Sequence, residues 1–212
     1  MKTTLILIRH GESASNLVNV IAGHLDVPLT DLGLEQARQT EAHLASMPID
    51  AIYSSDLQRA LNTAKPHAER RGLCVIPDPE LREICCGRWE GKAREELEKT
   101  DTKAYCEGFR HHYFGFTMPE GESEHACRAR FYNAVQRIAG QHAGKTVLIV
   151  SHGAVIRSFW AAIRGLTDEE ANKVQDYPSN ASYSVAEFDG ERFTPIQFSQ
   201  DSHLTSVTHV HI

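Results

Sequence analysis

Two histidines and two arginines occupy positions where an anion could be held. The segment 9–11 (Arg-His-Gly) ends the apolar run of residues 3–8, and the segment 151–153 (Ser-His-Gly) ends a second run, TVLIVS. Arg59 falls in the first turn of a predicted helix that follows a third apolar run. Cations gathered at one place repel one another unless an anion binds between them. Because a guanidinium fork matches phosphate oxygens, the pattern predicts a phosphate site.

The elements that must position these residues alternate along the chain. Strands are predicted at residues 3–8, 51–54, 75–76 and 146–151, with a terminal pair at 183–188 and 193–198. Helices are predicted at about residues 31–46, 56–71, 123–142 and 153–164. The first would be capped by Thr30 or Asp31, the second by Ser55 or Asp56, and the third by Ser123. This alternation favours an α/β fold, a mostly parallel central sheet with helices on both faces. Ligands of such sheets bind beyond the carboxyl ends of the strands.

Residues 92–121 differ from the rest of the chain because they are polar and aromatic, with the run HHYFGF near the middle. We predict that this segment is a cap-like insertion, part helix and part loop, over the site. It would lie within a single domain spanning residues 1–212. Lids of this kind can select a leaving group by charge and shape. Arg110 and His112 are the side chains expected to make that selection.

Composition limits the class of partner. The 212 residues carry a net charge of −6, which argues against nucleic acid and acidic membranes as partners. No apolar run approaches the 18 residues that a membrane helix needs, and no signal segment precedes the first strand. The five cysteines are odd in number, which argues against a disulfide framework and predicts a cytoplasmic location.

Six segments together resemble the histidine phosphatase superfamily, the phosphoglycerate-mutase-like group. They are LIRHGES with a following Asn, LTDLGLEQA, SSDLQRALNTA, LREICCGRWEG, PEGES and VLIVSHGAVIR. The resemblance runs from about residue 5 to residue 165 and is extended by NASYS at 180–184. It implies a three-layer sandwich. It also implies, for the phosphatase branch, hydrolysis of a small phosphorylated metabolite without a cofactor.

The resemblance also implies a role for each site residue. His10 would attack phosphorus and become phosphohistidine, while Glu83 would protonate the leaving oxygen and later activate water. Three side chains would bind the equatorial oxygens: Arg9, Arg59 and His152. Further substrate contacts would come from Ser13, Asn16, Ala22, Gly23 and Gly153. A surface salt bridge with Arg82 or Arg88 is the alternative for Glu83.

Three departures from the family pattern leave the substrate open. An aromatic residue is common in the family where Ser15 stands, and a polar residue is common at Ala22. Cys85-Cys86 replaces a stretch that often carries an acidic residue and an aromatic. All three departures are expected near the leaving group. Phosphosugar, phosphoglycerate, phosphoserine and ribazole phosphate therefore remain candidates, and a homodimer is also left open.

The sequence gives weaker support to a metal site and to other functions. His209 and His211 would share one strand face, but no carboxylate or cysteine accompanies them, so no metal is predicted. A mutase would return the phosphoryl group to another hydroxyl, and mutases of this family use extra segments to exclude water. A non-catalytic phospholigand-binding module would be expected to lack His10, Glu83 or an arginine. Phosphatase activity is the leading prediction.

Overall fold

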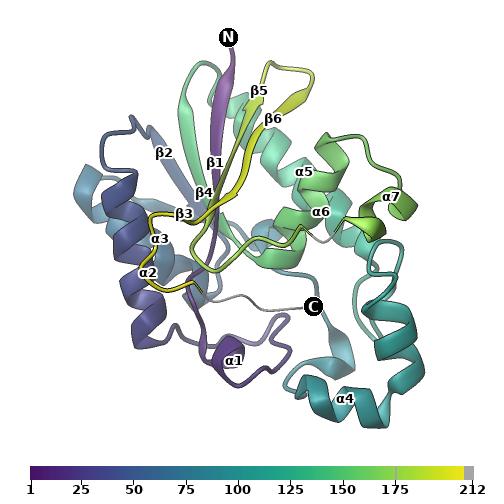
Figure 1. Cartoon of the computed structure of the whole chain (residues 1–212). Coiled ribbons are helices and arrows are strands. Elements are labelled where there is room, and N and C mark those ends of the chain that lie inside the picture. Colours follow the sequence, from purple (N-terminus) through teal and green to yellow (C-terminus); the bar gives the residue numbers. More distant parts are fainter. Residues whose placement is uncertain (175, 208–212) are drawn as a thin grey trace.

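Over the described residues, 1–174 and 176–207, the computed structural model forms a six-stranded mixed sheet with the order β3-β2-β4-β1-β5-β6 (Figure 1). The strands are β1 (Thr3–Arg9), β2 (Ala51–Ser54), β3 (Val75–Pro77), β4 (Thr146–Ser151), β5 (Tyr183–Phe188) and β6 (Phe193–Gln200). The strands β1 to β4 pair in parallel, whereas β5 runs antiparallel to both β1 and β6. The predicted α/β class and mostly parallel sheet are confirmed.

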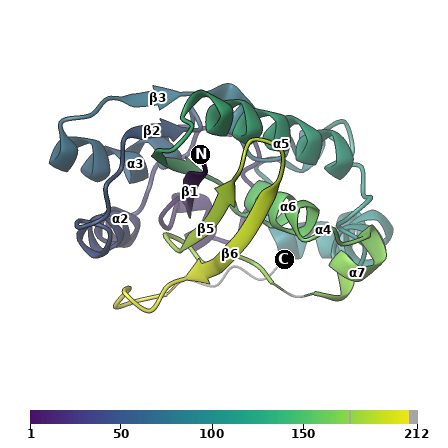
Figure 2. The ribbon, with the colours of Figure 1, turned by 90° about the horizontal axis from the view of Figure 1, so that it is seen from above.

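Helices cover both faces of this sheet. The α-helices of the described residues are α1 (Ala14–Leu17), α2 (Asp31–His43), α3 (Gln58–Arg71), α4 (Arg94–Thr100), α5 (Glu124–Gln141), α6 (Gly153–Ile163) and α7 (Asp168–Lys173). Viewed from above, α2 and α3 lie on one side of the sheet and α5 and α6 on the other (Figure 2). The three-layer arrangement expected from the resemblance is therefore present.

The central strand β1 is apolar at successive positions because both of its faces are buried. Leu5 and Leu7 belong to the core that includes residues of α5 and α6, whereas Ile6 and Ile8 belong to the core that includes residues of α3. All four side chains have no exposed surface. A strand covered on both faces needs apolar side chains at every position, which explains why the run shows no alternation.

The starts of two helices follow the predicted caps, and a third does not. The Thr30 hydroxyl accepts a hydrogen bond from the Gly33 amide at the start of α2, and the Ser123 hydroxyl accepts one from Ala126 at the start of α5. The helix α3 begins later than predicted, at Gln58 with Leu57 as its N-cap residue. Ser55 and Asp56 do not cap it because their side chains bond elsewhere, to His152 and to Arg82.

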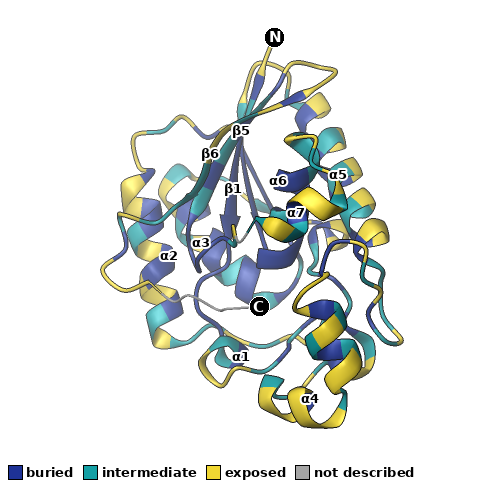
Figure 3. Cartoon of the chain, turned by 45° about the vertical axis from the view of Figure 1, so that its right-hand side comes forward, coloured by how far each residue is buried: buried dark blue, intermediate teal, exposed yellow. Residues whose placement is uncertain are grey.

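Residues 92–121, the segment predicted as a cap, form a lobe beyond the carboxyl ends of the strands (Figure 1). The lobe contains α4 and a π-helical segment, Lys103–Phe109, and it packs around Trp89. The Trp89 ring lies 5.6 Å from the ring of Tyr105 and 5.7 Å from those of Phe109 and Phe116, centroid to centroid. The helix α4 is mostly exposed, unlike the strands β1, β2 and β4 (Figure 3).

The structure adds a short helix to the predicted elements, and it does not describe one pair of histidines named in the sequence analysis. The short helix α7 was not predicted, although Thr167 and Glu170 form a capping box at its start. His209 and His211, the histidine pair weighed as metal ligands, fall outside the described residues. Within the described residues, no helix combines the length and apolar character needed to cross a membrane.

Candidate active site

A pocket opens where the predicted motifs meet, at the carboxyl ends of β1 and β4 and the starts of α3 and α6. Part of its wall comes from residues that the sequence predicts for the site, and these are joined by others from the first loop and the lobe. The wall consists of Arg9, His10, Ser15, Asn16, Val20, Ile21, Ala22, Gly23, Arg59, Glu83, Ile84, Cys86, Arg94, Phe109, Gly153, Ala154 and Tyr177. Eight of the ten predicted site residues are therefore brought together on one surface.

His10 is fixed with one ring nitrogen free for chemistry. Its Nδ1 lies 2.7 Å from the carbonyl oxygen of Gly11. A carbonyl oxygen can only accept a hydrogen bond, so Nδ1 carries the proton and the lone pair resides on Nε2. Burial, followed by the nearby charges of Arg59 and Arg9, holds the pKa of His10 well below 6.5. The ring is therefore neutral at pH 7 and has a nucleophilic nitrogen.

Arg59 is clamped by protein acceptors and still has donors left. Its Nη2 donates to the Gly23 carbonyl at 2.8 Å, Nη1 to the Leu25 carbonyl at 2.7 Å, and Nε to Nδ1 of His152 at 3.2 Å. Three of the five guanidinium N–H groups are used in this way, and two remain for a phosphate. Burial lowers the pKa of Arg59 to about 10, so the side chain keeps its charge at pH 7.

Arg9 is held by a backbone carbonyl and by an aromatic ring. Its Nη1 donates to the carbonyl of Pro178 at 2.7 Å, and its guanidinium carbon lies 5.1 Å from the ring centroid of Tyr177. Its Nε is buried and has no hydrogen-bond partner among the described residues. A buried N–H group without a partner is costly, and a bound anion would satisfy it.

His152 lies behind the pocket wall, although the sequence predicts it as a phosphate ligand. Its Nδ1 accepts from Arg59, so Nε2 carries the proton and donates to the Ser55 hydroxyl at 2.8 Å. Its ring centroid is 5.1 Å from that of His10. Both ring nitrogens bond to protein, so in this structure His152 orients Arg59 and packs against His10. Direct contact with phosphate would require one of these bonds to be exchanged.

Glu83 is docked on the start of α6. Its Oε1 accepts hydrogen bonds from the amides of Ile84 at 2.9 Å and Val155 at 3.2 Å, and Oε2 accepts from Ala154 at 3.0 Å. The alternative of a surface salt bridge is wrong, since Arg82 and Arg88 pair with aspartates of other segments. Oε2 accepts from only one protein donor, so it can form a further hydrogen bond within the pocket that Glu83 lines.

Asn16 presents its amide nitrogen because its oxygen is fully occupied. The Oδ1 atom accepts from the Ser13 amide at 3.1 Å, the Ser13 hydroxyl at 2.9 Å and Nδ2 of Asn180 at 3.1 Å. Ser13 itself is fully buried and does not line the pocket, so the structure does not bring it together with the other predicted site residues. Its place on the wall is taken by Ser15. Asn180, which the sequence did not assign a role, also donates to the backbone carbonyl of His10 at 3.0 Å.

The part of the pocket wall that lies beyond these charged and polar side chains is largely apolar. Its apolar wall consists of Val20, Ile21, Ala22, Ile84, Cys86 and Phe109. Gly23 has a φ of +51°, and a Cβ there would meet the carboxyl group of Glu90, so the loop requires glycine at this position. Burial raises the pKa of the Cys86 thiol well above its usual value, which keeps the thiol protonated. Arg94 and Tyr177 add polar groups that the sequence did not assign to the pocket wall.

Several residues considered from the sequence lie elsewhere. Arg110 donates to Glu98 at 2.7 Å and His112 is exposed, and neither lines the pocket. His203 bonds through Nε2 to the Thr40 hydroxyl at 2.9 Å and is also absent from the wall. The segment predicted as a cap thus reaches the pocket, but through Arg94 and Phe109 rather than through the residues that were expected.

The described part of the chain offers one group of three possible metal ligands, away from the pocket. It joins Glu124 and His125 of α5 to Asp168 of α7. His125 and Asp168 already share a 2.6 Å hydrogen bond, and Arg128 pairs with both carboxylates. The group therefore has a resident cation and serves to join the two helices.

Comparison with known proteins identifies the family. Residues 5–201 match the model of the histidine phosphatase superfamily, branch 1. The chain is 35% identical over 203 residues to phosphoglycerate mutase-like protein 4 of Arabidopsis thaliana, covering 94% of this chain and 86% of that protein. It is 32% identical to phosphoserine phosphatase 1 of Hydrogenobacter thermophilus, covering 94% of this chain and 93% of the relative.

Solved structures agree with this assignment. Bacillus stearothermophilus YhfR superposes with a TM-score of 0.89 at 33% identity, covering 95% of this chain and 99% of that one. A mycobacterial glucosyl-3-phosphoglycerate phosphatase complexed with VO3 gives a TM-score of 0.85 at 28% identity, covering 93% and 99%. The family names and the phosphatases among the relatives support a phosphatase. This chain belongs to the histidine phosphatase superfamily.

Proposed function

We propose that this protein is a cofactor-independent phosphatase that hydrolyses a small phosphomonoester through a phosphohistidine on His10. The observation that carries the proposal is the hydrogen bond from Nδ1 of His10 to the Gly11 carbonyl. It leaves the lone pair on Nε2, within a pocket whose wall also contains three arginines, Arg9, Arg59 and Arg94. A neutral, oriented imidazole beside cations is the arrangement that nucleophilic attack on phosphorus needs.

In the first step, Nε2 attacks phosphorus in line and the bond from phosphorus to the leaving oxygen breaks. The spare N–H groups of Arg9 and Arg59 and the amide of Asn16 stabilise charge on the equatorial oxygens. The proton of Glu83 passes from Oε2 to the leaving oxygen, which departs as an alcohol. Glu83 is then a carboxylate, bound by the amides at the start of α6.

In the second step, the Glu83 carboxylate takes a proton from water as the oxygen of that water attacks phosphorus. The bond between phosphorus and Nε2 breaks, so inorganic phosphate is released and His10 is neutral again. The hydrogen bond from Nδ1 to Gly11 is retained through both steps, and it stabilises the ring while it carries the phosphoryl group. Glu83 ends the cycle protonated, and the net reaction consumes one water.

The test is to trap the intermediate. Enzyme mixed with phenyl phosphate and quenched without acid should carry one phosphoryl group, which peptide mass spectrometry should locate on His10. His10→Ala should fold, should show no phosphorylation, and should lose at least about a thousandfold in kcat, as nucleophile removal does elsewhere. Phosphate found on a serine or a cysteine would contradict the mechanism. No turnover of any phosphomonoester would favour a binding module.

Transfer to a second hydroxyl is the alternative outcome for the same intermediate. One relative is named a phosphoglycerate mutase-like protein, and the shared first step does not separate the two reactions. Phosphorus NMR of a reaction with 3-phosphoglycerate distinguishes inorganic phosphate from an isomeric ester. We expect inorganic phosphate as the main product.

A further inference from the structure

The segment that carries Glu83 is held in place by side chains of other elements. It covers residues 80–85 and belongs to no strand and no α-helix. Each of its first four backbone carbonyl groups accepts a hydrogen bond from a side chain. The Ser151 hydroxyl, at the end of β4, donates to the Leu81 carbonyl at 2.7 Å. The other three carbonyl groups accept from one side chain, that of Arg130 in α5.

Arg130 uses all five of its N–H groups in protein contacts. Its Nη1 donates to the carbonyl groups of Glu80 at 2.7 Å and Arg82 at 3.0 Å, and its Nη2 donates to that of Glu83 at 3.1 Å. The other edge of the guanidinium forms a two-point ion pair with Glu122, with Nε to Oε1 at 3.0 Å and Nη2 to Oε2 at 2.9 Å. The guanidinium is therefore fully occupied by the protein.

Glu122 extends this hold to the far end of the segment. Its Oε2 also accepts from the Cys85 amide at 2.9 Å, and its own amide donates to the Cys85 carbonyl at 2.9 Å. The carboxyl group of Glu83 is held separately, by amides at the start of α6. The pair formed by Arg130 and Glu122 thus fixes the backbone on both sides of the residue whose carboxyl group faces the pocket.

The loss of the guanidinium would leave three carbonyl groups and one carboxylate without their donor. These groups are largely shielded from water, so the segment must move to recover hydrogen bonds. One other side chain, that of His24, donates to the Glu83 carbonyl, from Nε2 at 2.8 Å, and it cannot replace the bonds to Glu80 and Arg82. A displacement of about 1 Å can cost a catalytic group roughly 100-fold in rate.

We propose that Arg130, paired with Glu122, is a positioning residue for the acid of the reaction. It holds the backbone of residues 80–85 so that the carboxyl group of Glu83 meets the leaving oxygen. Arg130 is not part of the pocket wall, so it acts through Glu83. The inference rests on the proposed function, in which Glu83 donates the proton. The competing account is that Arg130 only stabilises the fold, which would affect every substrate equally.

The kinetic experiment compares leaving groups in the first step. The alkoxide of glycerol 3-phosphate needs a proton to depart, whereas p-nitrophenolate does not. In single-turnover measurements of alcohol release, Arg130→Met should slow glycerol 3-phosphate by at least about tenfold and p-nitrophenyl phosphate by less than about threefold. Arg130→Lys, which keeps donors but loses the planar fork, should restore part of the difference.

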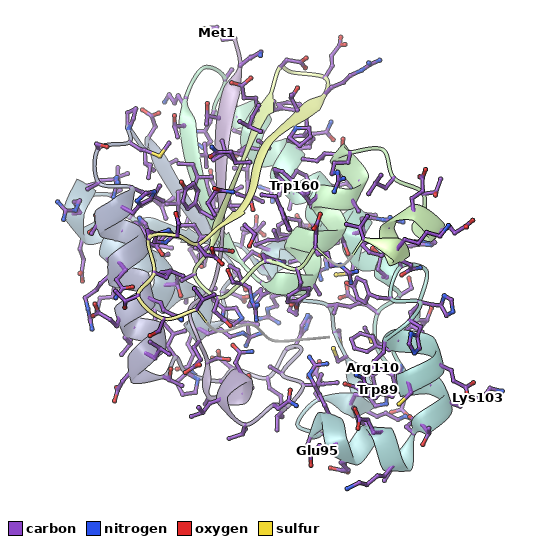
Figure 4. All side chains as sticks on the ribbon, viewed as in Figure 1. Met1, Trp89, Glu95, Lys103, Arg110 and Trp160 are labelled. Atoms are coloured by element: carbon purple, nitrogen blue, oxygen red, sulfur yellow. The ribbon has the colours of Figure 1, made fainter. Side chains whose placement is uncertain are left out.

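Two other arginines provide matched controls. Arg137 lies on α5 like Arg130, but it pairs with carboxylates of the neighbouring turn, at 2.5 and 3.1 Å. Arg110, labelled in the lobe in Figure 4, pairs with Glu98 at 2.7 Å. Arg137→Met and Arg110→Met should leave the ratio of the two rates unaltered. In the Glu83→Gln background, Arg130→Met should change the ratio by less than about twofold, because its effect passes through Glu83.

A second readout does not depend on turnover. The amides of Ala154 and Val155 lie in the first turn of α6, where the helix supplies no acceptor, and both donate to the Glu83 carboxyl group. Their hydrogen exchange, followed by NMR, should be at least about fivefold faster in Arg130→Met and approach the rate in Glu83→Ala. The Ile156 amide, which donates to the N-cap carbonyl of the same helix at 3.2 Å, is the reference.

An equal loss for the two esters in Arg130→Met, or unaltered exchange at Ala154 and Val155, would overturn the inference. Equal losses for the two esters in Glu83→Gln would instead overturn the acid role of Glu83 in the proposed function. The exchange rates would still decide whether Arg130 positions that side chain. If Arg130→Met does not fold, Arg130→Lys and Glu122→Ala decide by the same ratio and the same exchange rates.

Discussion

The two halves of the pocket are built in different ways. The phosphate half is held by backbone groups of the sheet and its loops: Arg59 bonds to two carbonyls, Arg9 to one, and Asn16 to an amide. The leaving-group half is formed by the first loop and by the lobe of residues 92–121, whose own aromatic cluster packs around Trp89. There, Arg94 has one side-chain hydrogen bond, to a phenol.

Under the proposed function, this difference separates the chemistry from the choice of substrate. Charged groups that stabilise a transition state must be preorganised, which favours strand ends and helix starts. A wall formed by a peripheral lobe can change without disturbing them. Relatives at 28–35% identity carry names that refer to phosphoserine, glucosyl-3-phosphoglycerate and phosphoglycerate. Those names differ in the leaving group and share the phosphate, as the two halves of this pocket lead one to expect.

The largest effect should come from the acid of the phosphate half. Glu83→Gln keeps one oxygen to accept from the amides at the start of α6 but cannot supply a proton. We expect kcat for glycerol 3-phosphate to fall by about 100- to 10,000-fold, the usual range for loss of a general acid or base. p-Nitrophenyl phosphate should lose much less in a burst-phase measurement of the first step, because its leaving group needs no proton. Equal burst-phase losses for both esters would show that Glu83 is not the acid.

Arg59→Ala should lower activity toward all substrates alike. The two spare N–H groups of Arg59 serve the phosphoryl group, which is common to every ester. We expect kcat/KM for phenyl phosphate, glycerol 3-phosphate and 3-phosphoglycerate to fall by about 2–4 kcal/mol in transition-state stabilisation. Arg59→Lys should not rescue activity, because a single ammonium cannot serve Gly23, Leu25, His152 and phosphate together. A loss that depends on the leaving group would break the separation between the two halves.

The phosphate half was also the more predictable from the sequence. Buried parallel strands appear as uninterrupted apolar runs, so residues 3–8 and 146–151 could be identified, and strand ends indicate where a ligand binds. Which polar side chain faces the ligand was less predictable. Ser13 turns inward to Asn16, and His152 bonds to Arg59 and Ser55, because those contacts depend on neighbours that are distant in sequence.

For the leaving-group half, the sequence predicted which segment lies over the site but not which of its residues line the pocket. Residues 92–121 stood out by composition, yet the basic side chains chosen there, Arg110 and His112, lie outside the pocket. Arg94 and Phe109 reach it because the aromatic cluster around Trp89 fixes the orientation of the lobe, and no periodic pattern encodes that packing. The capping box Thr167-x-x-Glu170 was a local signal for α7 that could have been used.

The stability of the protein at low pH also distinguishes the part built on the central sheet from the lobe of residues 92–121. Buried histidines lie in the part built on the sheet, whereas the histidines of the lobe are exposed. His67 of α3 is fully buried, and burial lowers its pKa from 6.5 to about 3. Below pH 6.5 the unfolded chain binds a proton at this residue that the native state does not, so stability falls as pH falls. At pH 5 the loss is about 2 kcal/mol for this group alone.

His67→Leu should remove that contribution. The difference in the free energy of unfolding between pH 7 and pH 5, measured by urea titration, should shrink by about 2 kcal/mol. The exposed His111 of the lobe provides the matched control, and His111→Gln should leave the pH dependence unaltered. The same pH dependence in His67→Leu and the unaltered protein would mean that His67 does not remain neutral in the native state.

The smallest effect concerns the apolar wall. Phe109 lines the pocket and packs against Trp89, Tyr105 and Tyr113, so Phe109→Leu removes ring surface from the leaving-group side while keeping an apolar side chain. We expect KM for phenyl phosphate to rise by a factor that corresponds to a loss of roughly 1 kcal/mol in binding free energy, with kcat nearly unchanged. The reason is that the apolar wall contacts the ground state and the transition state equally. His112→Ala, three residues away and exposed, should change both constants by less than about 0.5 kcal/mol. A fall in kcat for Phe109→Leu without a rise in KM would mean that the lobe positions the reacting groups. The two halves of the pocket would then act as one unit.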